Sequence, residues 1–395
     1  MSDIQGTVAP GWEPVRAAFV TNLSETEEVG AGVAVYHRGR NVVDLTGGRF
    51  EDTAGSAPYS TDTLQLVFST TKGITAIAVA ICVDRGLIDY DAPVARYWPE
   101  FAANGKGDIT VGQLLSHQAG LYTIDGSPSL AQVLDWTWIT ERLAEQAPLW
   151  APGTAHGYHA VTYGWLAGEL VRRVDPGHRS LGTFVTDEIV ARLGVEFWIG
   201  LPEELESRVS PIIPATPPDD PALIALAEQF MGPNTSGGRA LSVSGAFSDT
   251  GGIDGLVFNS RAVHAAEIPA ANGITNAASL ARIYAATIGE VDGVRLVQPA
   301  TVERMRTTVT PAGEADMCLI MPTTFGMGFM TYGMFSPYAG PGSFGHPGAG
   351  GSVAFAQPER ELSVGYTMNR MAQNLAADAR AQRLSEAAAA CADAV

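Results

Sequence analysis

Hydrophobic residues recur with two periodicities along the chain, one typical of helices and one typical of strands. Residues 10–23 carry apolar side chains at helical spacing, and two β-rich runs follow at 31–37 and 41–46, joined by Arg38-Gly39-Arg40. This pattern predicts a helix and then a β-hairpin near the N-terminus. The last third of the chain is predicted to form short strands at 325–331, 343–346, 351–357 and 362–368, and an Ala-rich closing helix at 372–392.

Helical spacing dominates the middle of the chain. Helices are expected at 74–83, 109–117, 128–147, 158–174 and 276–289. The first of these is apolar except at Thr75, and Thr110 stands where the N-cap of the second is expected. Six prolines fall within 202–221, which predicts a loop-rich excursion there.

Extended segments at both ends with helices between them predict an α/β (α+β) fold. In this fold, one antiparallel sheet, flanked by helices, is built from both termini and interrupted by a mostly helical domain. We expect the α/β domain to comprise residues 1–85 and 265–395, and the helical domain to comprise residues 86–264. A chain of 395 residues is long enough for two such units. Because pockets commonly lie between domains, the active site is expected in the cleft between these two.

Composition and charge narrow the classes of partner. The formal net charge is −18, which argues against nucleic acid and anionic membrane surfaces as partners. No run approaches the roughly 18 consecutive apolar residues of a membrane-spanning helix, and residues 1–10 lack a signal-peptide pattern. The three cysteines form neither a disulfide framework nor a zinc-binding spacing. We therefore expect a cytoplasmic protein that needs no metal or other cofactor, and the sequence assigns no oligomeric state.

The candidate chemistry begins with Ser69 and Lys72, which stand three residues apart where a helix is expected to start. Positions i and i+3 share a helix face, so the hydroxyl and the amine can meet. A serine nucleophile needs a neighbouring base, and lysine can be that base when burial or nearby positive charge lowers its pKa. Only Lys72 and Lys106 among the 24 basic residues are lysines. Since arginine does not release its proton, a lysine here indicates a chemical requirement, although this spacing also arises by chance.

Two further stretches could complete a serine-hydrolase site. The phenol of Tyr158 could act as general base and then as general acid if nearby ammonium groups lower its pKa, whereas a core or rim tyrosine is the alternative. His159 is a rival base, for which we favour a place at the rim. The glycine-rich run 344–352 implies a backbone that approaches something closely. Its N–H groups could bind an oxyanion, and a plain turn is the alternative.

The motifs occur in the order and approximate spacing of one family. They are Ser69-Thr70-Thr71-Lys72, the run 114–121, Pro152-Gly153-Thr154 with Tyr158, and His346-Pro347-Gly348 with Gly350-Gly351. The chain resembles the β-lactamase-like serine hydrolases related to class C β-lactamases and DD-peptidases. Within that group it looks most like the family VIII carboxylesterases. The resemblance covers about residues 10–390 and implies that family's two-domain fold, with the active site in the cleft.

The resemblance also implies roles for individual residues. Ser69 would be the nucleophile that becomes acylated, Lys72 would activate it, and Tyr158 would relay the proton in acylation and deacylation. The oxyanion hole would be formed by the backbone N–H groups of Ser69 and Ala349. The residues expected to bind substrate are His346, Gly348 and His159.

Two departures from the family pattern bear on the substrate. The tyrosine motif is Tyr158-His159-Ala160 in place of Tyr-x-Asn, and His346-Pro347-Gly348 replaces Lys-Thr-Gly. The lost amide, ammonium and hydroxyl groups are those that bind a peptide-like amide and a substrate carboxylate. We therefore expect a carboxylesterase whose substrate is a small-molecule ester. The preference for short acyl chains is what the resemblance implies.

Other functions could use the same residues. A β-lactamase, a small-amide hydrolase, an acyltransferase and a non-catalytic penicillin-binding-type protein remain alternatives. A different esterase design is disfavoured, because the G-x-S-x-G elbow of α/β-hydrolases occurs at no serine of the chain.

Overall fold

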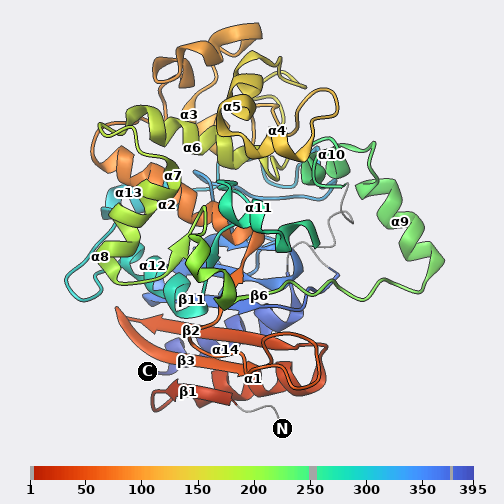
Figure 1. Cartoon of the computed structure of the whole chain (residues 1–395). Coiled ribbons are helices and arrows are strands. Elements are labelled where there is room, and N and C mark those ends of the chain that lie inside the picture. Colours follow the sequence, from red (N-terminus) through yellow and green to blue (C-terminus); the bar gives the residue numbers. More distant parts are fainter. Residues whose placement is uncertain (1–3, 249–255, 374–376) are drawn as a thin grey trace.

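The architecture is a sheet built from both ends of the chain, with a group of helices on one side of it (Figure 1). The computed structural model describes residues 4–248, 256–373 and 377–395. Its larger sheet has seven strands, all paired antiparallel, in the order β1-β3-β2-β11-β10-β9-β8. They are β1 (Ile4–Val8), β2 (Gly30–His37), β3 (Arg40–Gly48), β8 (Met330–Thr331), β9 (Phe344–Pro347), β10 (Val353–Gln357) and β11 (Leu362–Met368). The predicted fold class, with an antiparallel sheet drawn from both termini, is confirmed.

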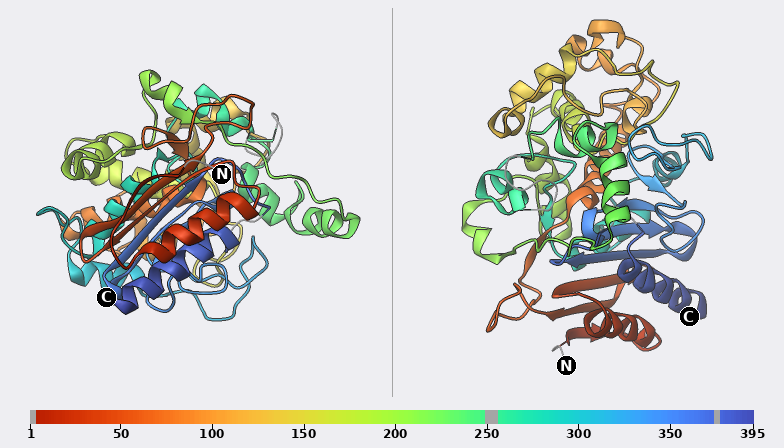
Figure 2. Two further views of the ribbon diagram at one scale, coloured as in Figure 1. Left: turned by 90° about the horizontal axis from the view of Figure 1, so that it is seen from below. Right: turned by 90° about the vertical axis from the view of Figure 1, so that its right-hand side faces the viewer.

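The N-terminal and C-terminal parts of the chain meet at the centre of this sheet. β2 pairs with β11, so that Ala31 stands opposite Met368 and His37 stands opposite Leu362. Every residue of both strands is buried, because helices cover the two faces. α1 (Glu13–Glu25) and α14 (Ala379–Ala394) lie side by side on one face (Figure 2). α12 (Ala277–Ile288) packs on the strands from the other side.

A smaller sheet leads into the candidate nucleophile. Its strand order is β5-β7-β4-β6. The strands are β4 (Leu64–Leu66), β5 (Phe197–Trp198), β6 (Val209–Ser210) and β7 (Ile274–Thr275). A 3-10 turn, Phe68–Thr70, follows β4 and leads directly into α2 (Thr71–Asp84), whose residues from Thr71 to Cys82 are buried. The smaller sheet therefore fixes the point at which α2 begins.

The remaining helices fill the middle of the chain. They are α3 (Val111–Leu115), α4 (Leu130–Leu134), α5 (Trp136–Glu145), α6 (Thr162–Val174), α7 (Leu181–Val185), α8 (Ala191–Leu193), α9 (Pro221–Met231), α10 (Ser236–Ser242), α11 (Arg261–Ala265) and α13 (Pro299–Arg306). α3 through α6 gather at the end of the molecule away from α1 and α14 (Figure 1). The division into units at residues 85 and 265 stays a prediction. Within the described ranges, no helix is both long enough and apolar enough to cross a membrane.

Local sequence patterns predicted most of the helices and strands, and the differences between the prediction and the structure have physical causes. Residues 362–368 form β11 as predicted, and Thr110 caps α3 through a capping box. The predicted helix 158–174 begins only at Thr162, because side chains from elsewhere in the chain bind the N–H groups of Tyr158 and His159. β1 was not predicted, since it is a polar edge strand with three exposed central residues.

Two further expectations were wrong in extent. The excursion at 202–221 is loop-rich, and it is followed by helix α9, which was not predicted and whose described side chains are mostly exposed. The strand predicted over 325–331 is reduced to β8. The closing helix begins at Ala379 rather than at residue 372. Residues 374–376 of that prediction lie outside the described residues.

Candidate active site

The nucleophile turn places Ser69 at the start of α2 with an accessible side chain. Phe68 has φ +45°, a left-handed conformation that costs a non-glycine residue of order 1 kcal/mol. Ser69 is half-buried, whereas Phe68 and Thr70 on either side of it are buried. The hydroxyl of Thr71 binds the carbonyl of Phe68 and accepts the N–H of Gly273 at 2.9 Å. These contacts hold the strained turn in place.

Lys72 is fully buried beside the serine. Its Nζ lies 2.9 Å from Ser69 Oγ, 2.6 Å from the carbonyl oxygen of Ala160 and 2.9 Å from that of Ala270. Burial holds the pKa of the Lys72 amine well below its ordinary value. The i and i+3 spacing thus does bring the hydroxyl and the amine together, in a setting that favours the neutral amine.

Tyr158 completes a chain of three side chains. Its Oη lies 2.8 Å from Ser69 Oγ, and Lys72 Nζ lies 4.8 Å from the centroid of its ring. The sequence suggested that nearby ammonium groups would lower the pKa of this phenol. Instead, burial raises the pKa of Tyr158 above its ordinary value, while the hydrogen bond with Ser69 opposes that rise. Tyr158 is therefore a phenol that donates a hydrogen bond, rather than a phenolate.

Asp316 was not predicted, and it anchors the backbone of Tyr158. Its side chain is fully buried. Oδ1 accepts the N–H groups of Tyr158 at 2.9 Å, Cys318 at 2.8 Å and Leu319 at 2.9 Å. Oδ2 accepts the hydroxyl of Thr323 at 2.9 Å. No sequence motif marks this residue, because the contact joins positions 158 residues apart.

His159 lies next to Tyr158 but has both ring nitrogens engaged by the backbone. Nε2 accepts the N–H of Leu121 at 2.9 Å, and Nδ1 lies 2.6 Å from the carbonyl oxygen of Gly157. The side chain is fully buried, and burial lowers its pKa to about 4. This geometry argues against both the rim position and the substrate contact that the sequence suggested for His159. A neutral imidazole that ties two loops together fits these contacts.

His346 faces the tyrosine as an uncharged group. Its ring is stacked on that of Tyr158, with centroids 5.9 Å apart, and its Nδ1 lies 2.7 Å from the carbonyl oxygen of Pro347. Burial and the nearby Lys72 hold the pKa of His346 well below its ordinary value. The position where the family pattern has a lysine therefore carries no positive charge here.

Gly348 and Ala349 belong to a turn that touches the nucleophile turn. A Cβ added to Gly348 would lie 2.3 Å from the carbonyl oxygen of Val67 and 2.1 Å from Ser352 Oγ. The Ser352 hydroxyl is 2.9 Å from the same carbonyl and 3.1 Å from Thr70 Oγ1. The predicted importance of Gly348 thus has a steric cause, which is the close approach of two backbones. Its predicted contact with substrate stays a prediction.

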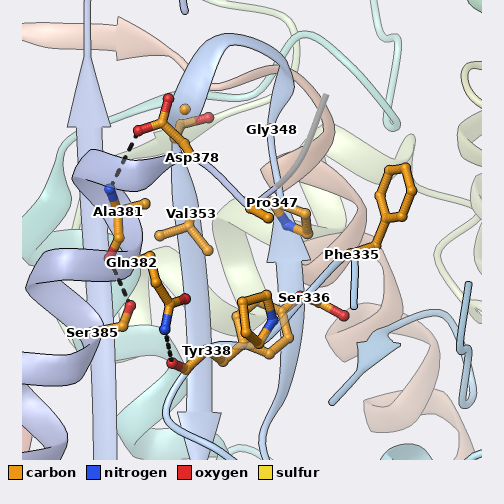
Figure 3. Close-up of a pocket in the computed structure, with 14 residues that line it drawn as sticks. Phe335, Ser336, Tyr338, Pro347, Gly348, Val353, Asp378, Ala381, Gln382 and Ser385 are labelled. Atoms are coloured by element: carbon orange, nitrogen blue, oxygen red, sulfur yellow. Dashed lines mark hydrogen bonds between the residues drawn. The ribbon is translucent and has the colours of Figure 1, made fainter. Parts of the chain in front are cut away.

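A small recess lies behind this turn, between α14 and the strands β9 and β10 (Figure 3). It shares Pro347 and Gly348 with the site, but Ser69, Lys72 and Tyr158 do not line it. Among the described residues, no group of three or more His, Cys, Asp or Glu side chains is placed to hold a metal ion.

Comparisons with known proteins cover almost the whole chain. The sequence model of the β-lactamase family matches residues 15–389. The curated protein "Esterase/beta-lactamase LipL" of Mycobacterium tuberculosis is 36% identical over 374 residues, which span 93% of this chain and 83% of LipL.

Solved structures also match almost the whole chain. A family VIII carboxylesterase superposes with a TM-score of 0.87 at 37% identity, covering 98% of this chain and 100% of that chain. A penicillin-binding protein homologue from Caulobacter crescentus superposes with a TM-score of 0.85, also at 37% identity and with the same coverage.

Proposed function

The chain belongs to the β-lactamase family and is a serine hydrolase, and from this premise we propose that it is a carboxylesterase for small, uncharged, short-chain acyl esters. One observation carries the proposal. Ser69 Oγ lies between Lys72 Nζ, at 2.9 Å, and Tyr158 Oη, at 2.8 Å. A base and an acid therefore flank the nucleophile, which is what acyl transfer requires.

The contacts of Lys72 support its role as the base. In the neutral amine, the two N–H groups would bind the carbonyls of Ala160 and Ala270, which leaves the lone pair for the hydroxyl of Ser69. In acylation, Ser69 passes its proton to Lys72 and attacks the ester carbonyl. Tyr158 donates its proton to the departing alkoxide. The products are the acyl-enzyme, the alcohol, the Lys72 ammonium and a Tyr158 phenolate that the ammonium stabilises.

Deacylation reverses these roles. The Tyr158 phenolate takes a proton from water, and the resulting hydroxide attacks the acyl-enzyme. The ammonium of Lys72 then returns a proton to Ser69 Oγ as the acid leaves. The oxyanion of each tetrahedral intermediate would be bound by the N–H groups of Ser69 and Ala349. Each residue ends the cycle in its starting protonation state.

The electrostatics of the site support a neutral ester as substrate. Burial keeps the His346 and His159 rings next to Tyr158 uncharged. A substrate carboxylate would find no ammonium group at position 346, and the net charge of −18 repels anions at long range. An ester also has a better leaving group than an amide, so it demands less of the general acid.

The second candidate is a β-lactamase, because the relative LipL is described as an esterase and β-lactamase. The decisive experiment compares hydrolysis of a short-chain nitrophenyl ester with hydrolysis of a chromogenic cephalosporin, with Ser69→Ala as the control. Fast ester cleavage that depends on Ser69, with little lactam turnover, is the expected result. Dominant lactam turnover would favour the second candidate, and no turnover of either would contradict the proposal.

A further inference from the structure

A buried arginine makes a hydrogen bond to the turn that contains Ala349. Arg380 lies in the first turn of α14, and its side chain is 6% exposed. Its Nη2 donates to the carbonyl oxygen of Gly350 at 2.6 Å. The N–H of Ala372 binds the same carbonyl at 2.9 Å. The peptide that follows Gly350 is thereby fixed from outside the turn.

Every N–H of the Arg380 guanidinium has an acceptor. Besides Gly350, it binds Asp378 through Nε at 3.1 Å and Nη2 at 3.0 Å, and Glu28 and the carbonyl of Arg370 through Nη1, at 3.2 and 3.0 Å. Five donors thus meet five acceptors in a fixed planar fork. Lysine has the same charge but offers only three donors from one point, so it could not reproduce this arrangement.

The turn is held on its other side by the nucleophile turn. Within the turn, the N–H of Gly348 binds the carbonyl of Ser352 at 2.6 Å, and the N–H of Gly351 binds the carbonyl of Gly348 at 3.1 Å. The hydroxyl of Ser352 donates to the carbonyl of Val67, two residues before Ser69. The turn around Ala349 is therefore clamped between Arg380 on one side and the start of α2 on the other.

The turn has little space in which to relax. A Cβ on Gly351 would lie 2.6 Å from Arg380 Nη2 and 2.9 Å from Asp378 Oδ2, and a Cβ on Gly350 would lie 2.7 Å from Met371. Figure 3 shows Asp378 at the start of α14, beside β10, the strand that carries Val353 and follows the turn. The ion cluster and the turn are thus in direct contact.

We propose that Arg380 is a positioning residue for the oxyanion hole. Held by Glu28 and Asp378, its guanidinium fixes the Gly350 carbonyl. This restrains the turn whose Ala349 N–H, two peptide units earlier, would bind the ester oxygen. This inference rests on the proposed function, because it assumes that Ala349 binds the oxyanion. An oxyanion donor stabilises charge most when its direction is fixed before the reaction begins, because no free energy is then spent on reorienting it.

The test compares Arg380→Lys with Arg383→Lys. Arg383 lies on the same helix and binds Asn22 of α1 rather than the turn, so it is a matched control for exchanging an arginine of α14. The kcat and KM for a short-chain nitrophenyl ester are measured well below the unfolding temperature. The rate at which a nitrophenyl phosphonate labels Ser69 is measured in parallel, because its tetrahedral adduct also places an oxygen in the hole.

For Arg380→Lys we expect kcat and the labelling rate to fall together by about 10- to 100-fold, with KM changed by less than about threefold. Arg383→Lys should stay within about twofold of wild type in both rates. A folded Arg380→Lys protein with wild-type kcat and labelling rate would overturn the positioning role. Absence of Ser69-dependent ester turnover in the wild type would instead overturn the proposed function itself.

A second variant decides the matter if Arg380→Lys does not fold. Glu28→Leu removes both the carboxylate and the hydrogen bond that hold the guanidinium and roughly keeps the size of the side chain. A fall in both rates of about threefold or more, with KM unchanged, supports the proposal. Wild-type rates in folded Glu28→Leu would contradict it.

Discussion

Lys72 Nζ lies 2.9 Å from Ser69 Oγ, and its two other hydrogen bonds reach backbone carbonyls rather than carboxylates. A carboxylate would stabilise the ammonium form, whereas carbonyls in a buried setting leave the neutral amine accessible. The other lysine, Lys106, is also buried and also binds carbonyls, and burial lowers its pKa to about 8. Burial alone therefore does not identify the base, and the adjacent serine does.

Replacing the base by arginine should abolish catalysis. Lys72→Arg keeps a positive charge, but arginine does not deprotonate at workable pH. We expect kcat/KM for a nitrophenyl ester to fall by at least about 1,000-fold. Lys106→Arg is the matched control for exchanging a buried lysine, and it should keep near wild-type activity if folded. An active Lys72→Arg enzyme would exclude the general-base role.

The pH profile of kcat/KM should report the same two groups. Protonated Lys72 has no lone pair, so activity is lost on the acid side, below the Lys72 pKa. Since burial lowers that pKa, the acid limb should lie well below the ordinary value of 10.5. Tyr158 must hold its proton, and burial raises its pKa above 10.0, so activity should persist to at least that pH. An acid limb near 10.5 would contradict this assignment.

Sequence patterns found the site where the chemistry is local. Ser69 and Lys72 are one helical turn apart, and Gly348 lies in a conspicuous glycine-rich run, so spacing alone drew attention to them. Tyr158 was a candidate from the sequence, with a core or rim tyrosine as the alternative, and the resemblance to a family favoured its catalytic role. Asp316 and Arg380 were missed because each acts through contacts with distant segments, and neither stands in a local pattern.

Contacts between distant segments also limited how much of the fold could be predicted. The buried strand β11 has a continuous β-rich sequence, and its bounds were predicted correctly. The edge strand β1 is held by pairing with β3 rather than by apolar burial, so its sequence is polar. The start of α6 is set by side chains that bind the N–H groups of Tyr158 and His159. The position of β1 and the start of α6 are set by long-range hydrogen bonds, which leave no periodic pattern in the sequence.

Removing the anchor of Tyr158 should lower kcat. In Asp316→Ala, the buried N–H of Tyr158 and the three other donors lose their acceptor, which should cost roughly 3–5 kcal/mol of unfolding free energy. We expect kcat to fall about 10- to 100-fold as the phenol moves away from Ser69.

The isosteric variant Asp316→Asn separates the effect of the hydrogen bond to the Tyr158 N–H from the effect of the negative charge of Asp316. Its amide oxygen can still accept the N–H of Tyr158, so most of kcat should remain. The Asp316 charge contributes to the raised pKa of Tyr158. Its loss should therefore move the basic limb of the pH profile to lower pH. Equal kcat in the alanine variant and wild type would show that Asp316 does not position Tyr158.

Adding a methyl group at Gly348 should damage activity and stability together. The new Cβ would lie 2.3 Å from the carbonyl oxygen of Val67, and backbone at that point cannot move without shifting Ser69. We expect Gly348→Ala to lose about 1–3 kcal/mol of unfolding free energy and at least about tenfold in kcat. Gly107→Ala is the control, because its nearest neighbour is 4.0 Å away. Normal activity of Gly348→Ala would mean that the two turns can separate freely.

The buried cluster around Arg380 predicts how stability depends on pH. Burial raises the pKa of Glu28 from 4.5 to about 7, although Arg380 and the hydroxyl of Tyr366 oppose the rise. A raised folded-state pKa means that the folded protein holds the proton more tightly. The resulting stabilisation is complete below pH 4.5 and is lost as pH rises through 7.

A shift of this size corresponds to about 3 kcal/mol of unfolding free energy. Glu28→Gln cannot titrate, so its unfolding free energy should gain about that amount relative to wild type between pH 4.5 and pH 8. Denaturant unfolding of both proteins across that range measures the difference, and Glu27→Gln is the control, since Glu27 is an exposed neighbour whose side chain is 66% accessible. Parallel curves for Glu28→Gln and wild type would show that Glu28 keeps its ordinary pKa. In that case Glu28 would be ionised over most of the pH range tested.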